Sequence, residues 1–233
     1  MFNKITLSLA MLSLPMHVSA DVSEEDIDFS NPTSVYSAFD VNAGTDGVAL
    51  GLTLAGELSD NWAFLSKLEL RENTDMLRVR GAAVANDIGT GFMLDYIKHN
   101  DFHIDIEDSK SETLVINAMQ VLPFNDGKTM LVPIVGIGYT NNDFARSSTN
   151  IWMAQSMIIH NWTDNIWTNF TPIWTNSFSD MEMKNGMANQ RIKSFDMEFV
   201  AGYRFSGNQN VRLHLNHNED NKTETWAAYT YAF

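Results

Sequence analysis

The chain has 233 residues, no cysteine and a formal net charge of −14 at pH 7. Because nucleic-acid phosphates require a basic protein face, this acidic balance argues against a nucleic-acid partner. The absence of cysteine excludes a disulfide-stapled domain and thiolate metal sites.

The N-terminus, Met1–Ala20, predicts a cleaved secretory signal. Lys4 supplies a positive start, Ile5–Leu14 an apolar run, and Val18–Ala20 a small-residue cleavage site. A run of about ten apolar residues is too short to cross a membrane as a helix. We therefore expect export, with cleavage after Ala20. Removal of the signal takes away one basic residue and no acidic one.

The next segment, residues 21–33 (DVSEEDIDFSNPT), is acidic and has no usable period. We expect a short periplasmic arm here. The alternative is that the segment folds into the rest of the protein as a plug.

From Ser34 onward the sequence becomes a series of alternating runs separated by turn residues. In Trp62–Arg71, apolar Trp62, Phe64, Leu68 and Leu70 share one parity, and the charged Lys67, Glu69 and Arg71 share the other. Strict alternation of this kind is typical of a strand with one apolar and one polar face. Twelve such runs follow one another, and ten remain an alternative if the first or another weak run is misread: Ser34–Asn42, Gly47–Leu58, Trp62–Arg71, Met76–Ala85, Gly89–His99, Glu112–Leu122, Thr129–Thr140, Thr149–His160, Ile166–Ser177, Ser194–Phe205, Val211–Asn218 and Thr223–Phe233.

The connections between these runs also alternate in length. Those after Leu58, Ala85, Phe124, His160 and Phe205 are short, and most of the others are longer. Bacterial transmembrane barrels have an even strand number, short periplasmic turns and longer outer loops. The pattern therefore predicts an all-β, antiparallel transmembrane barrel over residues 34–233. A soluble β-sandwich, with the apolar faces buried in a core, is the structural alternative.

The last run, Thr223–Phe233, places four apolar or aromatic side chains on one face up to the final residue. These are Ala227, Tyr229, Tyr231 and Phe233. The segment resembles the closing strand of Gram-negative outer-membrane proteins, and the chain is similar in size to small monomeric porins. This resemblance implies an outer-membrane location, recognition of the four residues by the barrel-assembly machinery, and contact with lipid and lipopolysaccharide.

Two features resist the simple pattern. Pro133 and Pro172 lie inside expected strands, where each removes a ladder hydrogen bond, so we expect a bulge or register shift at each. The runs Thr129–Thr140 and Thr149–His160 are apolar on both parities. Either they face a filled interior or the alternation fails there.

Polar residues opposite the lipid-facing parity are the candidate lumen lining. Fixed charges on a lumen wall select solutes in a channel, whereas a closed interior would pair the same charges with one another. Both readings stay open. The candidates are Lys67, Glu69, Arg71, Arg78, Arg80, Asp95, Asn117, Asp196, Glu198, Arg204, Arg212 and His214.

Two expected outer loops are rich in carboxylates and histidine, and we expect solvated acidic loops, with no metal and no cofactor. Oxygen-rich clusters can hold divalent cations, which is the alternative for these loops. The first loop contains His99, Asp101, His103, Asp105, Glu107 and Asp108, and the second His217, Glu219 and Asp220.

An enzymatic barrel is a third possibility, weaker than the other two. A membrane lipase would need paired serine and histidine, which Ser156 and His160 supply only at a spacing of four. A protease would need an Asp and His pair at the outer rim, such as His217 with Asp220. We therefore expect a passive channel for small solutes with a mixed-charge lumen. The alternative is a non-conducting surface barrel whose acidic loops bind ions, lipopolysaccharide or a partner.

Overall fold

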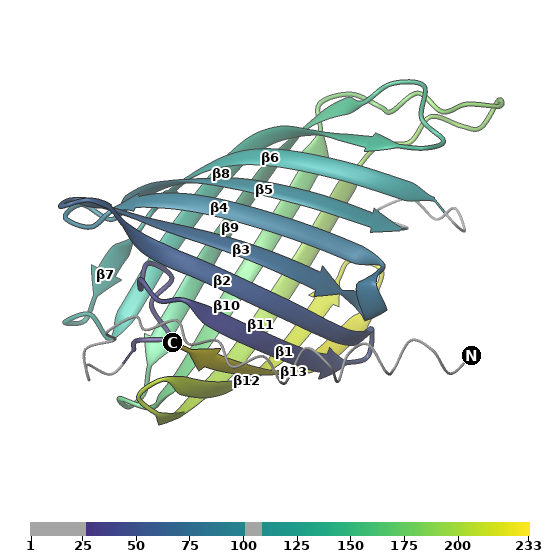
Figure 1. Cartoon of the computed structure of the whole chain (residues 1–233). Helices are drawn as coiled ribbons and strands as arrows, with labels where there is room; N and C mark the ends of the chain where they lie inside the picture. Colours follow the sequence, from purple (N-terminus) through teal and green to yellow (C-terminus); the bar gives the residue numbers. More distant parts are fainter. Residues whose placement is uncertain (1–26, 101–108) are drawn as a thin grey trace.

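The computed structural model describes residues 27–100 and 109–233. These residues form a closed antiparallel barrel of twelve strands (Figure 1). Thirteen strand segments build the barrel, because β6 and β7 are two parts of one interrupted strand. The segments are β1 (Ala38–Gly44), β2 (Gly47–Ser59), β3 (Trp62–Arg71), β4 (Met76–Ala85), β5 (Thr90–Asn100), β6 (Lys110–Gln120), β7 (Leu122–Phe124), β8 (Thr129–Asn142), β9 (Thr149–Asn161), β10 (Ile166–Ser177), β11 (Lys193–Ser206), β12 (Gln209–Asn218) and β13 (Thr223–Ala232).

Each strand pairs with the next one along the chain, and the barrel closes where β1 pairs with β13. The closing seam runs from Ala38 opposite Ala232 to Gly44 opposite Trp226. Beyond the last strand, the Phe233 N–H donates to the Ser37 carbonyl at 2.9 Å. Closure leaves no strand edge unpaired, which a bilayer requires of any sheet that crosses it. The soluble sandwich and the ten-stranded barrel are therefore excluded.

The break between β6 and β7 lies opposite Pro133. The pairs Met119↔Ile134 and Leu122↔Leu131 belong to the same register, and the ladder lapses only between them. Proline has no N–H to donate to the neighbouring strand. On the other side of the strand, the Val121 N–H donates to the Gly89 carbonyl at 2.8 Å, which continues the register of β5 with β6 beyond Thr90↔Gln120.

Pro172 has the same effect on the ladder between β9 and β10. Pairing stops after Phe170↔Ile158 and resumes at Ile173↔Gln155 without a change of register. The expected bulge or register shift at each proline is therefore wrong. The register shifts that the described strands do contain lie between Glu57 and Ser59 and between Arg204 and Ser206, at strand ends.

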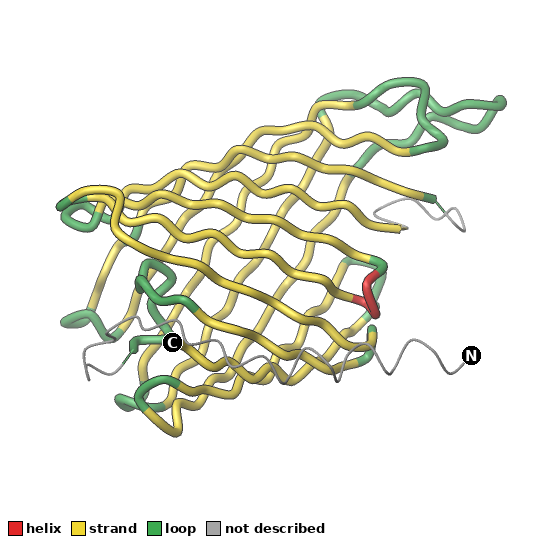
Figure 2. Tube along the Cα trace, in the orientation of Figure 1, coloured by secondary structure: helices red, strands yellow, loops and turns green. Residues whose placement is uncertain are grey.

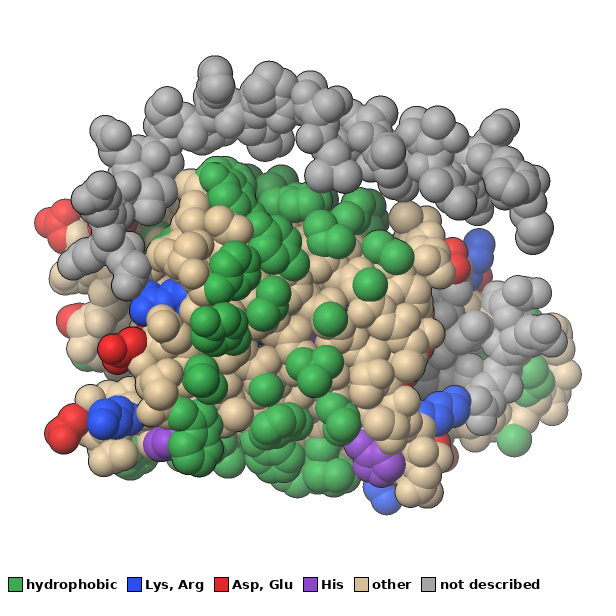
Figure 3. Space-filling view, turned by 90° about the horizontal axis from the view of Figure 1, so that it is seen from below, with side chains coloured by type: hydrophobic (Ala, Val, Ile, Leu, Met, Phe, Trp, Pro, Cys, Tyr) green, Lys and Arg blue, Asp and Glu red, His purple; other side chains and the backbone are tan. Residues whose placement is uncertain are grey.

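The outer surface of the barrel is apolar. Figure 3 shows apolar side chains spread over one face, with charged side chains gathered toward its two ends. Several large outward side chains are between about a third and two thirds exposed, including Leu213 at 60%, Ile137 at 65% and Tyr231 at 42%. Exposure on this scale suits a lipid-facing band with aromatic residues near the interfaces.

The turns and loops differ between the two ends of the barrel (Figure 2). The end with the C-terminus carries most of the tight turns, among them the turn at Asn125 and Asp126, both with positive φ, and Gly127, while the two-residue turn between β1 and β2 lies at the other end. The other end carries the long connection between β10 and β11 and the single-turn 3-10 helix η2 (Glu72–Thr74) between β3 and β4. Within the described residues, no helix has the length and apolar character needed to cross a membrane.

The start of the barrel differs from the sequence-based expectation. The first strand begins at Ala38, not at Ser34. Residues 27–36 instead fold into the barrel from the end that carries the tight turns. The Ile27 N–H donates to the Gly207 carbonyl in the β11–β12 turn at 3.0 Å. The signal, residues 1–20, and residues 21–26 of the expected arm lie outside the described residues.

Candidate lumen site

One wall of the lumen carries charged residues, and Asp40 on β1 lies at its centre. The carboxylate accepts hydrogen bonds from Arg212 Nη2 at 2.9 Å and from Thr230 Oγ1 at 2.5 Å. Lys67 Nζ lies 3.3 Å away from the other carboxylate oxygen. Asp40 is 2% exposed, so three strands converge on one buried acid.

The charged wall continues along β3, β4 and β5. Glu69 pairs with Lys67 at 3.2 Å and with Arg80 at 2.6 Å. Asp95 accepts two hydrogen bonds from Arg78, from Nε at 3.0 Å and from Nη2 at 2.5 Å. A bidentate arrangement of this kind fixes the guanidinium plane as well as its position.

A second group of polar and aromatic side chains lies toward the loop-bearing end of the same wall. His214 Nδ1 is 2.9 Å from Glu198 Oε1, and the His214 ring stacks on Trp226 at 4.8 Å. Arg71 also lies over the Trp226 ring, with its Cζ 5.3 Å from the ring centroid. Cation–π contact and ring stacking therefore hold both basic groups in place.

The acids that pair with the arginines of this wall lie deeper than their partners, whereas the Glu198 side chain, paired with His214, is 26% exposed. The Asp40 and Asp95 side chains are 3% and 4% exposed, whereas those of Arg78, Arg80 and Arg212 are 25%, 29% and 22% exposed. The acids lie against the barrel wall and the guanidinium groups reach past them toward the lumen. The lumen surface is thus more basic than the count of charges along the strands implies.

The opposite wall of the lumen is apolar. Inward residues of β6, β8 and β9 form a cluster that includes Met119, Val132, Ile134 and Ile159, with Met157 packed against it. This cluster explains why the runs Thr129–Thr140 and Thr149–His160 are apolar on both parities. One parity faces outward to lipid, and the other packs in the apolar interior. Pro133 lies on the lipid-facing parity of β8.

The N-terminal segment, residues 27–36, lies between these two walls. Phe29 packs in an aromatic cluster with Trp167 on β10 and with Tyr36, whose ring centroid is 5.2 Å from that of Phe29. The segment turns through hydrogen bonds from Ser30 Oγ to Asp28 Oδ1 at 2.5 Å and from Ser34 Oγ to the Asp28 carbonyl at 2.7 Å. It therefore enters the lumen as a compact turn that leads back to β1.

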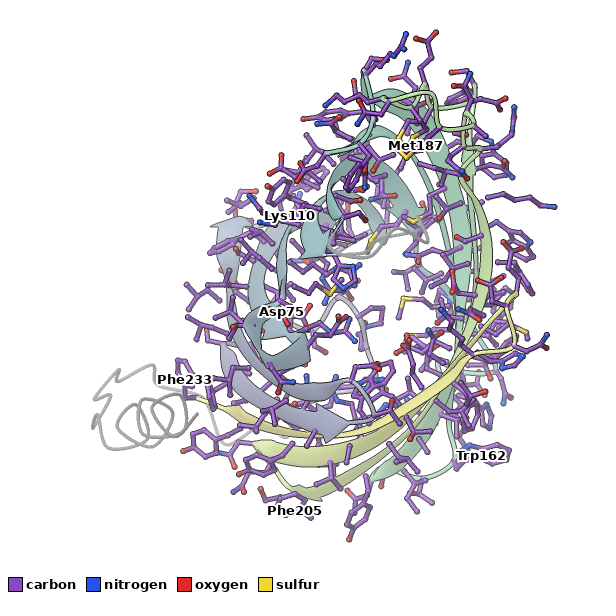
Figure 4. The ribbon with its side chains drawn as sticks, turned by 90° about the vertical axis from the view of Figure 1, so that its right-hand side faces the viewer. Asp75, Lys110, Trp162, Met187, Phe205 and Phe233 are labelled. Atoms are coloured by element: carbon purple, nitrogen blue, oxygen red, sulfur yellow. The ribbon has the colours of Figure 1, made fainter. Side chains whose placement is uncertain are left out.

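Two adjoining cavities of about 320 Å³ and 280 Å³ remain around this segment. Both are lined by Lys67, Arg78, Arg80 and Arg212 on the charged wall and by Met157 on the apolar wall. A third cavity of about 480 Å³ opens at the turn-bearing end, beside Trp162 and Arg204. Figure 4 looks into the barrel from the opposite end, past Asp75, Lys110 and Met187.

The loop between β10 and β11 forms a second apolar cluster with β6 and β9 at the mouth of the barrel. Met181 and Met183 of the loop are buried against Val115 on β6 and Ile151 on β9. Backbone hydrogen bonds, such as Arg146 N–H to the Glu182 carbonyl at 2.8 Å, join this loop to the β8–β9 loop. This mouth cluster is separate from the central cluster that contains Met119 and Ile159.

The sequence-predicted lumen residues all lie on the inward parity of their strands. Eight of them line the two central cavities. Asp95 and Asn117 lie behind these residues at 3% and 1% exposure, Asp196 lies near the loop-bearing end beside Ser194, Glu219 and Asp220, and Arg204 contacts the Ile27 carbonyl at 3.3 Å. The eight lining residues are Lys67, Glu69, Arg71, Arg78, Arg80, Glu198, Arg212 and His214.

Three parts of the site escaped sequence-based reasoning: Asp40, the methionine-rich wall and the inserted segment. Asp40 alternates with the outward Phe39 and Val41 and could have been found from parity alone. The methionines carry no polar signal, and their shared surface is formed by strands that only the barrel brings together. The sequence left open that residues 21–33 fold into the barrel as a plug, whereas residues 34–36 were expected in the first strand.

In the described residues, the acidic loops form no cluster of metal-ligating side chains. The serine, aspartate and histidine residues considered for an enzyme are not paired there either. Residues 101–108, which contain most of the first acidic loop, lie outside them, and the described residues contain no group of three or more metal-ligating side chains. His217 Nδ1 is 2.8 Å from Thr223 Oγ1, and His160 Nδ1 is 2.9 Å from Thr129 Oγ1. Neither histidine therefore has the partner that the enzymatic readings assigned to it.

Neither a protein-family model nor a curated protein matches the sequence. Solved structures share its fold. The NanC porin is 9% identical with a TM-score of 0.54 over 85% of this chain and 98% of that porin. An outer-membrane channel from Pseudomonas putida F1 is 10% identical, with a TM-score of 0.54 over 92% and 99% of the two chains. The translocator domain of the autotransporter NalP from Neisseria meningitidis is 11% identical, with a TM-score of 0.50 over 85% and 87%. At these identities the likeness concerns the fold, and the chain thus has the fold of outer-membrane β-barrels.

Proposed function

We propose that this protein is a passive outer-membrane channel for small solutes. The observation that carries the proposal is the pair of adjoining cavities, about 320 Å³ and 280 Å³, inside a closed barrel whose guanidinium groups face the cavity space. A barrel that served only as a scaffold would fill this space with side chains, since protein interiors pack closely.

The outer surface supports the proposed location. Apolar and aromatic side chains cover the outward parity of the strands, and the closing strand places Tyr229 and Tyr231 on that face. A cleaved signal over residues 1–20, assembly through the terminal Phe233, and contact with lipopolysaccharide complete the proposal. No catalytic role is part of it.

The first test of the proposal is to measure single-channel conductance of the refolded full chain in a planar bilayer. A heat-modifiable shift on a gel first shows that the barrel is folded. Steady conductance steps support the channel. A folded barrel that produces no steps contradicts it and favours the second candidate below.

Ion selectivity tests the charged wall. Replacing Arg78 and Arg80 by glutamine removes two positive charges, which leaves Asp95 without its arginine and Glu69 paired with Lys67 alone. We expect the reversal potential in a KCl gradient to shift toward cation selectivity, because fixed charge sets the ion preference of a narrow lumen. The matched control is Arg191→Gln, in the β10–β11 loop, which we expect to leave the reversal potential unchanged.

If the Arg78→Gln/Arg80→Gln double variant does not fold, a second variant tests the same charged wall. Arg71 lines the lumen near its mouth and is held by Trp226. Arg71→Gln removes one charge without breaking a pair with a buried acid. An unchanged reversal potential in a folded, conducting Arg71→Gln channel contradicts selection by this wall.

The second candidate function is a non-conducting surface barrel whose acidic loops bind ions, lipopolysaccharide or a partner. The observation that favours it is the inserted segment, residues 27–36, together with the paired charges of the lumen wall. This reading expects a folded barrel that never opens.

A further inference from the structure

The two lumen walls differ in chemistry, and the difference indicates what the cavity between them can hold. One wall carries Lys67, Arg78, Arg80 and Arg212, and the other carries Met119, Val132, Ile134 and Met157. All eight line the same cavity of about 320 Å³. A sugar-like solute, polar on every side, would leave its hydroxyls unpaired against the second wall, which is costly.

The charged wall keeps donor groups that its acids do not use. Within residues 27–100 and 109–233, Arg80 Nε and Arg212 Nε are buried and have no hydrogen-bond partner. The acids of this wall accept from other nitrogens of the same residues, Arg80 Nη2 and Arg212 Nη2. Buried donors of this kind are normally satisfied, by protein, water or ligand.

The apolar wall suits a ligand body of variable shape. Met93 also faces this cavity, beside Met119 and Met157. Methionine side chains are flexible and polarisable, and they adapt to aliphatic and aromatic surfaces alike. A separate apolar cluster that contains Val115, Ile151, Met181 and Met183 is buried nearer the mouth of the barrel.

We infer that the lumen binds small amphipathic organic anions, with the carboxylate or similar head at the Arg80 and Arg212 guanidinium groups and the apolar body against Met119 and Met157. This inference rests on the proposed channel function and names its substrate class. The ligand class is a short-chain or aromatic monocarboxylate, in contrast to a sugar acid.

The test compares two carboxylates of equal charge and equal carbon number, hexanoate and gluconate. Titration calorimetry with the refolded full chain in neutral detergent measures their binding, and protein-free micelles supply the blank. Hexanoate should bind about tenfold or more tightly than gluconate, because it alone buries methylene groups on the apolar wall. Equal binding of the two anions, or no binding of hexanoate, would overturn the inference.

Two variants separate the two walls. Arg80→Gln should weaken hexanoate binding roughly tenfold, by loss of a charge-assisted hydrogen bond. Met157→Gln should narrow the preference for hexanoate over gluconate toward unity. Arg191→Gln and Met187→Gln, both in the β10–β11 loop, are the matched controls and should bind like the unmodified chain. Unchanged binding in folded Arg80→Gln or Met157→Gln protein would contradict the assigned walls.

Bilayer recordings distinguish failure of this inference from failure of the channel itself. Conductance without a preference for hexanoate in the calorimetry would retain the channel and overturn the substrate class. Selective hexanoate binding in a barrel that never conducts would overturn the channel while keeping the binding site. In a conducting barrel, hexanoate should reduce the chloride current at concentrations at which gluconate has no effect.

Discussion

At the scale of single residues, the lumen wall is organised by where its acids lie. Asp40 joins strands β1, β3, β12 and β13 through Lys67, Arg212 and Thr230. A buried acid with two cations and a hydroxyl is satisfied, whereas without Asp40 the charge of Arg212 loses its acid partner and Lys67 keeps only Glu69. Asp40 is therefore expected to stabilise the closing seam as well as the lumen.

Asp40→Asn should lower the free energy of unfolding by about 2 kcal/mol, less than for a fully buried pair because Lys67 and Arg212 keep contact with the lumen. Urea unfolding of the refolded protein in lipid vesicles, followed by tryptophan fluorescence, measures the change. Asp180→Asn is the control, since its pair with Arg191 is more than half exposed and such pairs contribute little. Equal stability of the two variants would contradict the role given to Asp40.

At the scale of the elements, the two prolines and the inserted segment depart from a regular barrel in different ways. Pro133 and Pro172 each interrupt one ladder and preserve the register, so the sheet tolerates them at the cost of local pairing. Residues 27–36 occupy lumen space that a regular barrel would leave to water. The aromatic cluster of Phe29, Tyr36 and Trp167 anchors these residues inside the barrel.

Loss of that cluster should release the segment. Phe29→Ala removes the ring that packs between Tyr36 and Trp167, and we expect single-channel conductance to rise because the turn no longer stays in the lumen. Phe124→Ala, which truncates a half-exposed side chain on β7, is the control and should conduct normally. A conductance that Phe29→Ala leaves unchanged would show that the segment does not limit the flow.

At the scale of the whole molecule, the chain end completes the barrel. β13 pairs with β1, and the Phe233 N–H extends the seam by one bond to Ser37. The outward Ala227, Tyr229 and Tyr231 share the apolar parity of this strand, which is the parity that the sequence predicted.

Removal of Phe233 should reduce assembly in the outer membrane several-fold, because it takes away the terminal aromatic residue of the proposed assembly signal and one seam hydrogen bond. The measurement is the heat-modifiable fraction in isolated membranes. Phe205→Ala changes another outward aromatic residue near the same end of the barrel but leaves the terminus intact. If the chain without Phe233 assembles as well as Phe205→Ala does, the terminal residue has no special part in assembly.

The sequence by itself determined the class of fold, the lipid-facing parity and the inward parity of the charged residues, and it favoured twelve strands while leaving ten open. These properties follow from local alternation and turn composition, which each strand carries independently of its neighbours. Only the tertiary structure decided the depth of the acids beneath their arginine partners, the apolar wall shared by β6, β8 and β9, and the insertion of residues 27–36. Each of these depends on contacts between segments far apart in the chain, such as Asp40 with Arg212 and Phe29 with Trp167, and barrel closure alone brings those segments together.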